Sequence, residues 1–386
     1  MSPNSLGSEN EPSAVNILFI EQQPRFIGGS ERMSLSLCTQ MRRDGHSTHL
    51  LYEAEGDMVG AFREVTDSCT RAPVVPIALR RPSAALASLR HLRRAIRTHA
   101  IDVLFTSHLG YVPLLAAERF LGGTPSLIHI GLGDTPQTRL YKWAMPRVGA
   151  IVTPSEHMRA ICAAAGWPSA SLKVIPNGVD LERFKPVPER AALRLDLGLD
   201  PDLPLVVYMG RIVREKGVFC LVEAAAILKR RGMAFHLVLI GAAPGKEAVE
   251  LTAAAAAAGL GPDTFSLRGP TDRPERFLAA ADIVVVPTQG PESFGLAAVE
   301  AMACSTTTIV SDAGILPQIV GIENERCWFV QGDAEGLANR LEFFLGHPAE
   351  RVATGASLLA KVMRHYSLVQ CAAAYEKELR GCMEPV

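Results

Sequence analysis

A buried strand that runs into a polar loop and then a helix constrains this chain more than any other stretch. Residues 281–287 are apolar and rich in β-branched side chains, a pattern typical of a parallel strand covered on both faces. Residues 291–302 follow, reading Pro-Glu-Ser-Phe-Gly and then an apolar helical stretch. Open α/β sheets bind ligands at the carboxyl ends of such strands. This order therefore predicts an α/β domain with a ligand site at the loop.

Two carboxylates flank the start of that helix. Glu292 lies in the loop, and Glu300 lies eight positions further on, about two helical turns away. Free backbone N–H groups near Phe294, Gly295 and Leu296 would face an anion. This arrangement suits a ligand with hydroxyl groups at both ends and phosphate in the middle, which is the shape of a nucleotide-sugar. The alternative is that Glu292 complements the helix dipole and that Glu300 lies on a solvated face.

Length and composition set the broad class of the protein. A chain of 386 residues exceeds the roughly 250 to 300 at which a single hydrophobic core stops growing, so we expect two domains. With 48% hydrophobic and 20% charged residues, the chain can build large cores. Its net charge of -1 gives no reason to expect nucleic acid as a partner.

Cysteine usage and the start of the chain bear on the cellular compartment. The cysteines are scattered without a C-x-x-C pair or a histidine cluster at metal-ligand spacing, which fits a reduced cytosol and argues against a structural zinc. Residues 1–14 are polar and lack the basic and apolar regions of a signal peptide, so we expect a disordered leader. No apolar run approaches the roughly 20 residues that cross a bilayer. We therefore predict a cytoplasmic protein.

The first half of the chain alternates strand patterns with helical patterns. We predict strands at residues 15–20, 47–52, 74–77, 102–106, 150–153 and 172–175, with one more inside 126–131. Gly28 and Gly29 follow the first strand, where they would either let the backbone approach a ligand or simply form a tight turn. His108 and His129 lie at strand ends, where α/β sheets release residues toward a crevice. A lone histidine at such a place is more often structural, but two histidines on nearby strands are stronger evidence for a functional site.

Residues 80–100 contain six arginines and no acid, and their aliphatic residues recur at helical spacing. A basic amphipathic helix of this kind can lie on an anionic bilayer surface. It can equally be the solvated face of a crossover helix. Both interpretations stay open from the sequence.

The second half restarts the same alternation after a turn-rich exit. Prolines and an Asn-Gly turn within 176–188 mark the end of the first domain. The strand at 205–210 then runs into a loop with Arg211 and Lys216, two cations that could bind phosphate or could form a plain surface cluster. Further strands are predicted at residues 235–240, 265–268, 283–287 and 307–311. The second half is therefore predicted to be another doubly wound domain.

Four motifs now stand in a specific order: Gly-Gly-x-Glu at 28–31, Asn-Gly-Val-Asp at 177–180, Gly-Arg-x4-Lys-Gly at 210–217 and Glu-x7-Glu at 292–300. In this order the chain resembles glycosyltransferase family 4, whose members are retaining enzymes of the GT-B type. The likeness extends over about residues 15–382. It implies two Rossmann-like doubly wound domains that face each other across a cleft.

The resemblance also implies a division of the chain. Residues 15–190 would form the acceptor domain and residues 201–366 the donor nucleotide-sugar domain. A terminal helix at 367–382 would cross back onto the first domain.

The resemblance assigns roles to the motif residues. Arg211 and Lys216 would bind the diphosphate, Glu292 the sugar hydroxyls and Glu300 the ribose. The amides of Phe294, Gly295 and Leu296 would face the leaving group, and Gly28 and Gly29 would approach the diphosphate or the acceptor from the other lobe. A histidine of the first lobe would reach the transferred sugar, with His129 the better match and His108 the other candidate.

The implied activity is transfer of a hexosyl unit from a UDP- or GDP-sugar to a glycan, a lipid-linked or a small-molecule acceptor. No metal is expected, because two cations and a helix start would neutralise the leaving diphosphate. The alternatives are a non-catalytic nucleotide-sugar-binding partner subunit and a phosphorylase, for which no extra anion motif is visible. The protein would be cytoplasmic, with peripheral contact to the inner face of the membrane through residues 80–100 as one open interpretation.

Overall fold

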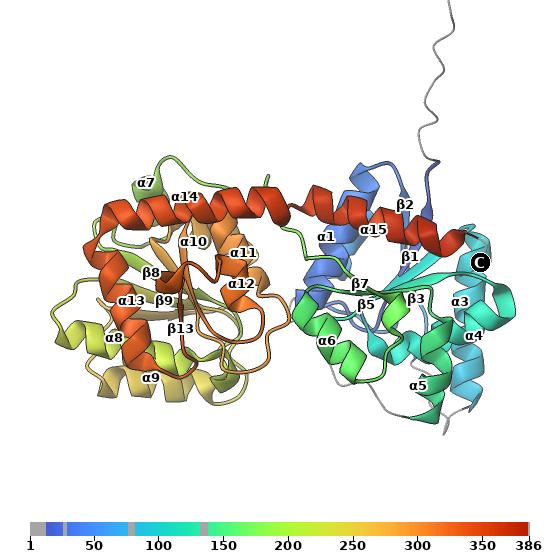
Figure 1. Ribbon diagram of the computed structural model, residues 1–386, viewed down its shortest axis with the longest axis horizontal. Helices are drawn as coiled ribbons and strands as arrows, with labels where there is room; N and C mark the ends of the chain where they lie inside the picture. The colour runs from blue at the N-terminus through green and yellow to red at the C-terminus, as the bar shows by residue number, and fades with distance from the viewer. Residues whose placement is uncertain (1–12, 26–28, 76–81, 132–137, 385–386) are drawn as a thin grey trace, which may run out of the picture.

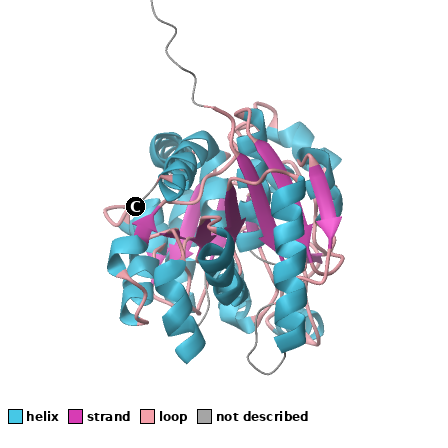
Figure 2. Cartoon of the chain, turned by 90° about the vertical axis from the view of Figure 1, so that its right-hand side faces the viewer, coloured by secondary structure: helices cyan, strands magenta, loops and turns pink. Residues whose placement is uncertain are grey.

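The computed structural model describes residues 13–25, 29–75, 82–131 and 138–384. These residues form two lobes, each a parallel sheet with helices on both faces (Figures 1 and 2). The predicted α/β architecture is therefore confirmed. Of the predicted leader at 1–14, only residues 13 and 14 are described.

The first lobe contains the N-terminal sheet. Its strands are β1 (Asn16–Glu21), β2 (Ser47–Tyr52), β3 (Ser68–Arg71), β4 (Val103–Thr106), β5 (Ser126–His129), β6 (Ala150–Thr153) and β7 (Leu172–Val174). Its helices are α1 (Gly29–Arg43), α2 (Val59–Val65), α3 (Pro82–Thr98), α4 (Val112–Gly122), α5 (Arg139–Ala144) and α6 (Glu156–Ala164).

The second lobe contains the other sheet. Its strands are β8 (Leu205–Met209), β9 (His236–Ile240), β10 (Phe265–Arg268), β11 (Ile283–Val286), β12 (Thr307–Ser311) and β13 (Trp328–Phe329). The helices of this part of the chain are α7 (Arg190–Asp196), α8 (Val218–Arg230), α9 (Glu247–Ala257), α10 (Pro274–Ala280), α11 (Leu296–Ala303), α12 (Leu316–Val320), α13 (Ala334–Gly346), α14 (Pro348–His365) and α15 (Leu368–Met383).

The strand order places a switch point in each sheet. The orders are β3-β2-β1-β4-β5-β6-β7 and β10-β9-β8-β11-β12-β13. The order in which the chain adds strands therefore reverses once in each sheet, between β1 and β4 and between β8 and β11. Strand β11 pairs with β8 in parallel, with Ile283 opposite Val206. The loops that leave β8 and β11 therefore emerge side by side, at the kind of position where open α/β sheets bind ligands.

The central strands are buried along their whole length. Every residue of β4, β5, β6 and β11 is buried. Helices cover both faces of each sheet, so these strands need apolar side chains on both sides rather than in alternation. This explains why continuous apolar runs located them in the sequence.

One predicted strand is wrong. The third strand lies at Ser68–Arg71, not at residues 74–77. The amide of Val74 donates to Ala72 O at 2.7 Å and closes a tight turn instead of joining the sheet. Prolines on both sides of the two valines also lack the N–H group that a ladder needs. Residues 76 and 77 lie outside the described part of the chain.

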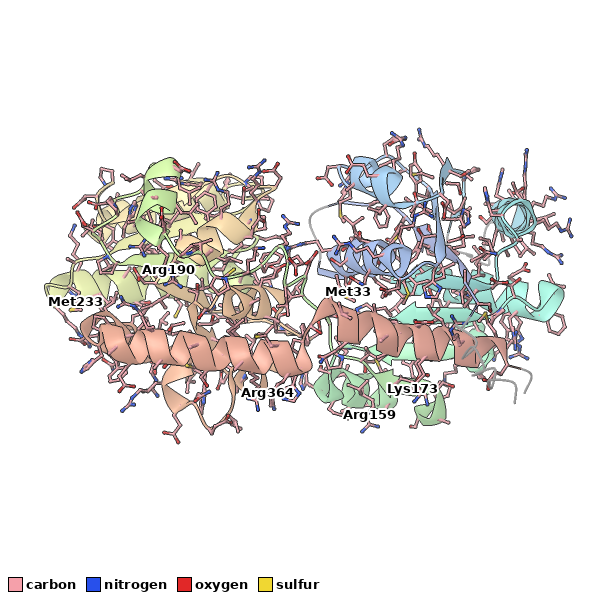
Figure 3. The ribbon with its side chains drawn as sticks, turned by 90° about the horizontal axis from the view of Figure 1, so that it is seen from above. Met33, Arg159, Lys173, Arg190, Met233 and Arg364 are labelled. Carbon is pink, nitrogen blue, oxygen red and sulfur yellow. The ribbon has the colours of Figure 1, made fainter. Side chains whose placement is uncertain are left out.

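The last two helices run end to end along both lobes (Figure 3). Helix α14 packs on α11 and β12 of the second lobe, whereas α15 packs on α1 and β5 of the first. Between them, the amide of Leu368 donates to Val179 O at 2.9 Å and the amide of Val179 donates to Tyr366 O at 2.8 Å. The segment that leaves the first lobe and the segment that returns to it are thus bonded to each other. The division of the chain at residues 190 and 201 stays a prediction.

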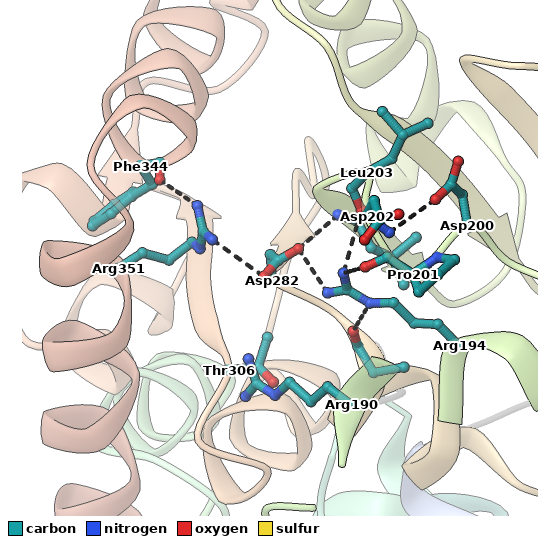
Figure 4. Close-up of polar contacts among 12 residues, drawn as sticks. Arg190, Arg194, Asp200, Pro201, Asp202, Leu203, Asp282, Thr306, Phe344 and Arg351 are labelled. Carbon is teal, nitrogen blue, oxygen red and sulfur yellow. Dashed lines mark hydrogen bonds and ion pairs between the residues drawn. The ribbon is translucent and has the colours of Figure 1, made fainter. Parts of the chain in front are cut away.

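A buried ion pair anchors α7 and α14 to the second sheet (Figure 4). Asp282 directly precedes β11, and its Oδ2 accepts from Arg194 Nη2 at 2.7 Å and from the amide of Leu205 at 2.8 Å. Arg351 of α14 contacts Oδ1 at 3.3 Å. The carboxylate therefore joins β8, β11 and two helices at the amino-terminal ends of these strands, opposite their carboxyl ends.

Replacing Arg194 with methionine should destabilise the second lobe strongly. The substitution leaves Asp282 poorly paired in a nearly buried position, which costs about 3–5 kcal/mol. Urea unfolding followed by circular dichroism measures the loss. Arg276→Met is the matched control, because Arg276 pairs with the exposed Asp196 and such pairs are worth about 0–1 kcal/mol. Equal losses in both variants would contradict the structural role of the buried pair.

Candidate functional site

A cleft of about 350 Å³ opens at the switch point of the second sheet and reaches α1 of the first lobe. It brings together residues from several separate parts of the chain. Those that the sequence singled out are Gly29, Arg211, Lys216, Glu292, Gly295 and Leu296. Gly28 lies outside the described residues.

Lys216 and Glu292 form an ion pair on the wall of this cleft. Lys216 Nζ lies 2.8 Å from Glu292 Oε2, and both side chains are largely buried. The other carboxylate oxygen, Oε1, accepts from the amide of Gly295 at 3.2 Å. Glu292 thus satisfies one donor at the helix start, as the alternative interpretation expected, while also lining the cleft.

Two glycines allow this close arrangement. Gly217 has a φ of 74°, and a Cβ there would collide with Pro287 O at the exit of β11. Gly295 has a φ of 85°, and a Cβ there would collide with Leu316 of α12. Both positions need the left-handed backbone that glycine adopts without strain. The loop carrying Lys216 can therefore lie directly against the strand that leads to Glu292.

The start of α11 offers backbone donors to the cleft. Leu296 and Ala297 line the cleft, and within the described chain their amides make no hydrogen bond. The amide of Gly295 is occupied by Glu292. Phe294 is buried, and its ring packs edge-on against Tyr366 at 5.7 Å. An anion at this point would meet unpaired N–H groups and the positive end of the helix.

Arg211 lies at the mouth of the cleft. Its Nη2 contacts Glu215 Oε1 at 3.0 Å, and both side chains are exposed. Its loop is held by Tyr208, whose hydroxyl donates to Arg211 O at 2.6 Å. An exposed pair of this kind is weak, so the guanidinium is free to exchange Glu215 for a stronger anion.

Glu300 lies beside the cleft in a smaller cavity of about 180 Å³. Its side chain is only 3% exposed, so the alternative interpretation, in which Glu300 lies on a solvated helix face, is wrong. Oε1 accepts from Arg32 of α1, and Oε2 has no hydrogen-bond partner in the described part of the chain. Burial raises the pKa of the Glu300 carboxyl, and the charge of Arg32 opposes that rise.

His108 lies within hydrogen-bond distance of a buried carboxylate. Its Nε2 lies 2.6 Å from Oε2 of Glu21, which ends β1 and is fully buried. Burial lowers the pKa of His108, but the hydrogen bond and charge of Glu21 outweigh this effect and leave the pKa above its ordinary value. The pair lies at the switch point of the first sheet, between β1 and β4.

His129 is a core residue in this structure. It is 1% exposed, and its Nδ1 lies 2.7 Å from the hydroxyl of Tyr375 on α15. Burial lowers the pKa of His129 to about 4, so the ring is neutral at physiological pH. Of the described residues that line the two cavities, none is His108 or His129. The structure therefore does not bring either predicted histidine into contact with the cleft.

The sequence did not single out three residues that contact the predicted ones. Arg32, Tyr375 and Glu21 bond to Glu300, His129 and His108 respectively. Only Glu21 carried a local signal, as a charged residue at the end of an apolar strand. Arg32 and Tyr375 contact residues that lie far from them in the sequence, and no local pattern reveals such contacts.

Two expectations from the sequence concern metal binding and membrane-spanning helices. Within residues 13–25, 29–75, 82–131 and 138–384, no three His, Cys, Asp or Glu side chains are grouped so that they could hold a metal ion. In the same ranges, no helix has the length and apolarity needed to span a bilayer.

Comparisons with known proteins match both halves of the chain to glycosyltransferases. A family model described as Glycosyltransferase Family 4 matches residues 27–183, and one described as Glycosyl transferases group 1 matches residues 189–357. The chain is 36% identical over 176 residues to D-inositol 3-phosphate glycosyltransferase of Nocardia farcinica, an alignment that covers 44% of this chain and 39% of that protein. The chain thus spans about two fifths of that curated relative.

Two further proteins match over more of their length. The GDP-mannose-dependent alpha-(1-6)-phosphatidylinositol monomannoside mannosyltransferase of Mycolicibacterium smegmatis is 28% identical over 312 residues, with 76% of this chain and 78% of that protein covered. A solved structure of Anabaena HepE in complex with UDP and glucose has a TM-score of 0.81, covering 94% of this chain and 99% of that one. At 20% identity, this last match shows the fold alone.

Replacing His108 with glutamine should lower stability most at acidic pH. Because the folded pKa of His108 is raised, its charged pair with Glu21 stabilises the fold below the unfolded pKa of about 6.5, and this is lost as pH rises through the folded pKa. Urea midpoints of wild type and variant should therefore differ more at about pH 5.5 than at about pH 9. His91→Gln serves as control, since His91 of α3 makes no hydrogen bond to a described residue. A difference that grows with pH would refute the charged pair.

Proposed function

The chain belongs to the group 1 glycosyltransferases of glycosyltransferase family 4, which have the GT-B fold, and on that premise we propose that it is an active hexosyltransferase. It moves a hexosyl unit from a UDP- or GDP-sugar to a glycan, a lipid-linked or a small-molecule acceptor, in polysaccharide or glycoconjugate biosynthesis. The observation that supports this best is the cleft where Arg211, Lys216 and Glu292 meet the start of α11. The names of the similar proteins include both GDP-mannose and UDP, so both donor bases enter the proposal.

The diphosphate of the donor lies against α11 in this proposal. The unpaired amides of Leu296 and Ala297 donate to its oxygens. Lys216 and Arg211 add two positive charges, and each is paired with a carboxylate that a diphosphate can replace or share. Donors and charges that are already in place stabilise the negative charge that develops on a leaving phosphate. No metal ion is needed in this scheme.

The sugar lies toward Glu292. Hydroxyl groups of a hexose donate to its carboxylate, which Lys216 and the Gly295 amide hold in place. The bond from the anomeric carbon to the diphosphate breaks through an oxocarbenium-like transition state. The acceptor oxygen bonds to the same face of that carbon, and its proton passes to the departing phosphate. The configuration is therefore retained without a protein nucleophile.

Between the two histidines, the exposure of the side chains favours His108 for contact with a substrate. His108 is partly exposed beside Glu21, whereas His129 is buried against Tyr375. We assign His129 to the packing of α15 against β5, and His108, which does not line the cleft, to acceptor binding at the switch point of the first sheet.

Nucleotide release from a panel of UDP-, GDP- and ADP-sugars tests the proposal, with Glu292→Gln as the informative variant. Losing the negative charge that faces the sugar should lower the turnover about 100-fold or more, by analogy with the loss of other preorganised electrostatic groups. Glu250→Gln is the matched control, because Glu250 pairs with Arg214 outside the cleft and its loss should leave turnover unchanged. Calorimetry with UDP and GDP identifies the preferred base.

A wild-type protein that binds a nucleotide but releases none from any donor would favour the non-catalytic partner subunit. A Glu292→Gln variant as active as wild type would remove the assigned role of Glu292.

We also propose that the surface of the first lobe formed by α3 and α4 contacts an anionic membrane. Helix α3 carries exposed Arg90, Arg94 and Arg97. It packs on α4, whose last turn exposes Phe120 at 72% and Leu121 at 54%. A basic helix beside exposed apolar side chains matches the two attractions that hold a protein on an anionic bilayer.

Sedimentation with vesicles tests this contact. Replacing Arg90, Arg94 and Arg97 with glutamine should weaken binding to vesicles that contain phosphatidylglycerol on the order of 100-fold, at about 1 kcal/mol for each charge. Binding to pure phosphatidylcholine should stay low. The control removes three exposed arginines of the second lobe, Arg230, Arg326 and Arg364. An equal loss of vesicle binding in both variants would show that only net charge matters, and it would refute α3 as a specific membrane-binding surface.

A further inference from the structure

An ion pair joins the two lobes beside the cleft. Arg32 lies in the first turns of α1 in the first lobe, and its guanidinium donates to Glu300 Oε1 in α11 of the second lobe. Arg32 lines both the 350 Å³ cleft and the 180 Å³ cavity, whereas Glu300 lines only the smaller one. The pair therefore stands at the point where the two cavities adjoin.

Glu300 has an unusual environment for a carboxylate. Its side chain is almost fully buried, and Oε2 has no hydrogen-bond partner among the described residues. Buried acceptors in folded proteins are nearly always paired, so an unpaired one marks a place where a donor is missing. A ribose hydroxyl group is a donor of the required kind.

The charged and titratable groups that face Glu300 come from several elements. They are Arg32 from α1, Arg183 and Asp180 from the segment between the lobes, Glu275 from α10 and Cys304, which directly follows α11. Arg183 is already engaged, because its Nε donates to Glu275 at 2.9 Å and its Nη2 donates to Asp272 O at 2.6 Å. Arg32 is thus the cation that hydrogen-bonds Glu300.

A buried carboxylate accepts hydrogen bonds from hydroxyl groups best when it is ionised. Burial disfavours the ionised form, and a cation in direct contact favours it. Arg32 also keeps Oε1 occupied, which restricts the rotation of the carboxylate. Both effects act on Glu300, the residue that the family resemblance assigns to the ribose of the donor.

We propose that Arg32, from the opposite lobe, is a positioning residue for the donor, which keeps Glu300 ionised and oriented so that it accepts a hydrogen bond from the ribose. This inference rests on the proposed function and extends it, because one residue that positions the ribose ligand Glu300 then comes from the acceptor lobe. Donor recognition requires both lobes to stand in the arrangement in which Arg32 reaches Glu300.

The test compares UDP and GDP with their 2′-deoxy forms by calorimetry, on wild type, Arg32→Gln and Arg32→Lys. Arg32→Gln should weaken binding of the preferred nucleotide about 10-fold, the effect of losing a charge-assisted hydrogen bond. The preference for ribose over deoxyribose should fall toward one. Arg32→Lys should recover part of both, because it restores the charge without the planar fork.

Measurements at about pH 6 and pH 8 add a readout that a purely structural role would not change. The pKa of Glu300 is already raised by burial, and removal of Arg32 takes away an opposing charge, so the variant should lose affinity at a higher pH than wild type. The phosphates of the nucleotide titrate equally in all variants. The ratio of variant to wild-type affinity therefore reports only the effect of Glu300 ionisation. The matched control is Arg42→Gln, on the same helix, whose partner Asp67 lies within the first lobe.

The outcomes separate the two proposals. If wild type binds neither UDP nor GDP, the proposed function fails. If wild type binds but Arg32→Gln keeps the ribose preference and the pH dependence of wild type, only the role of Arg32 fails. Tighter binding by Arg32→Gln would also overturn it, since Arg32 would then be masking Glu300 from the donor.

Discussion

The parallel pairing of β8 with β11 is the constraint on which the rest of the site depends. It sets two loops from distant parts of the second lobe side by side at one switch point. The first loop carries Arg211 and Lys216, and the second carries Glu292. Gly217 then lets the backbones of the two loops touch. Without this register, cations and carboxylate would be unrelated surface groups.

Burial of carboxylates explains the contacts of Glu292 and Asp282. A carboxylate taken out of water needs a cation and hydrogen bonds to remain charged. Glu292 is paired with Lys216 and a helix amide, and Asp282 with Arg194 and Arg351. These pairs occur where helices or loops are anchored to the ends of strands. The same physical rule thus organises both the cleft and the structural end of the second sheet.

Sequence patterns located the strands wherever both faces are covered, because such strands must be apolar along their whole length. The pattern failed at residues 74–77, where two valines between prolines looked like a strand but form a turn. The true third strand, Ser68–Arg71, is partly exposed at the sheet edge and carries no apolar run. The local signal was therefore absent where burial was absent.

The sequence by itself determined the two-sheet architecture and the four motifs that identify the family, since each is a local pattern of residue types. It also indicated which loops carry cations and carboxylates. The tertiary structure decided how those residues are paired. It buried Glu300 and joined it to Arg32 of the other lobe, and it enclosed His129 against Tyr375 of the last helix. Such contacts join residues more than 200 positions apart, so they depend on how lobes and helices pack and not on any pattern along the chain.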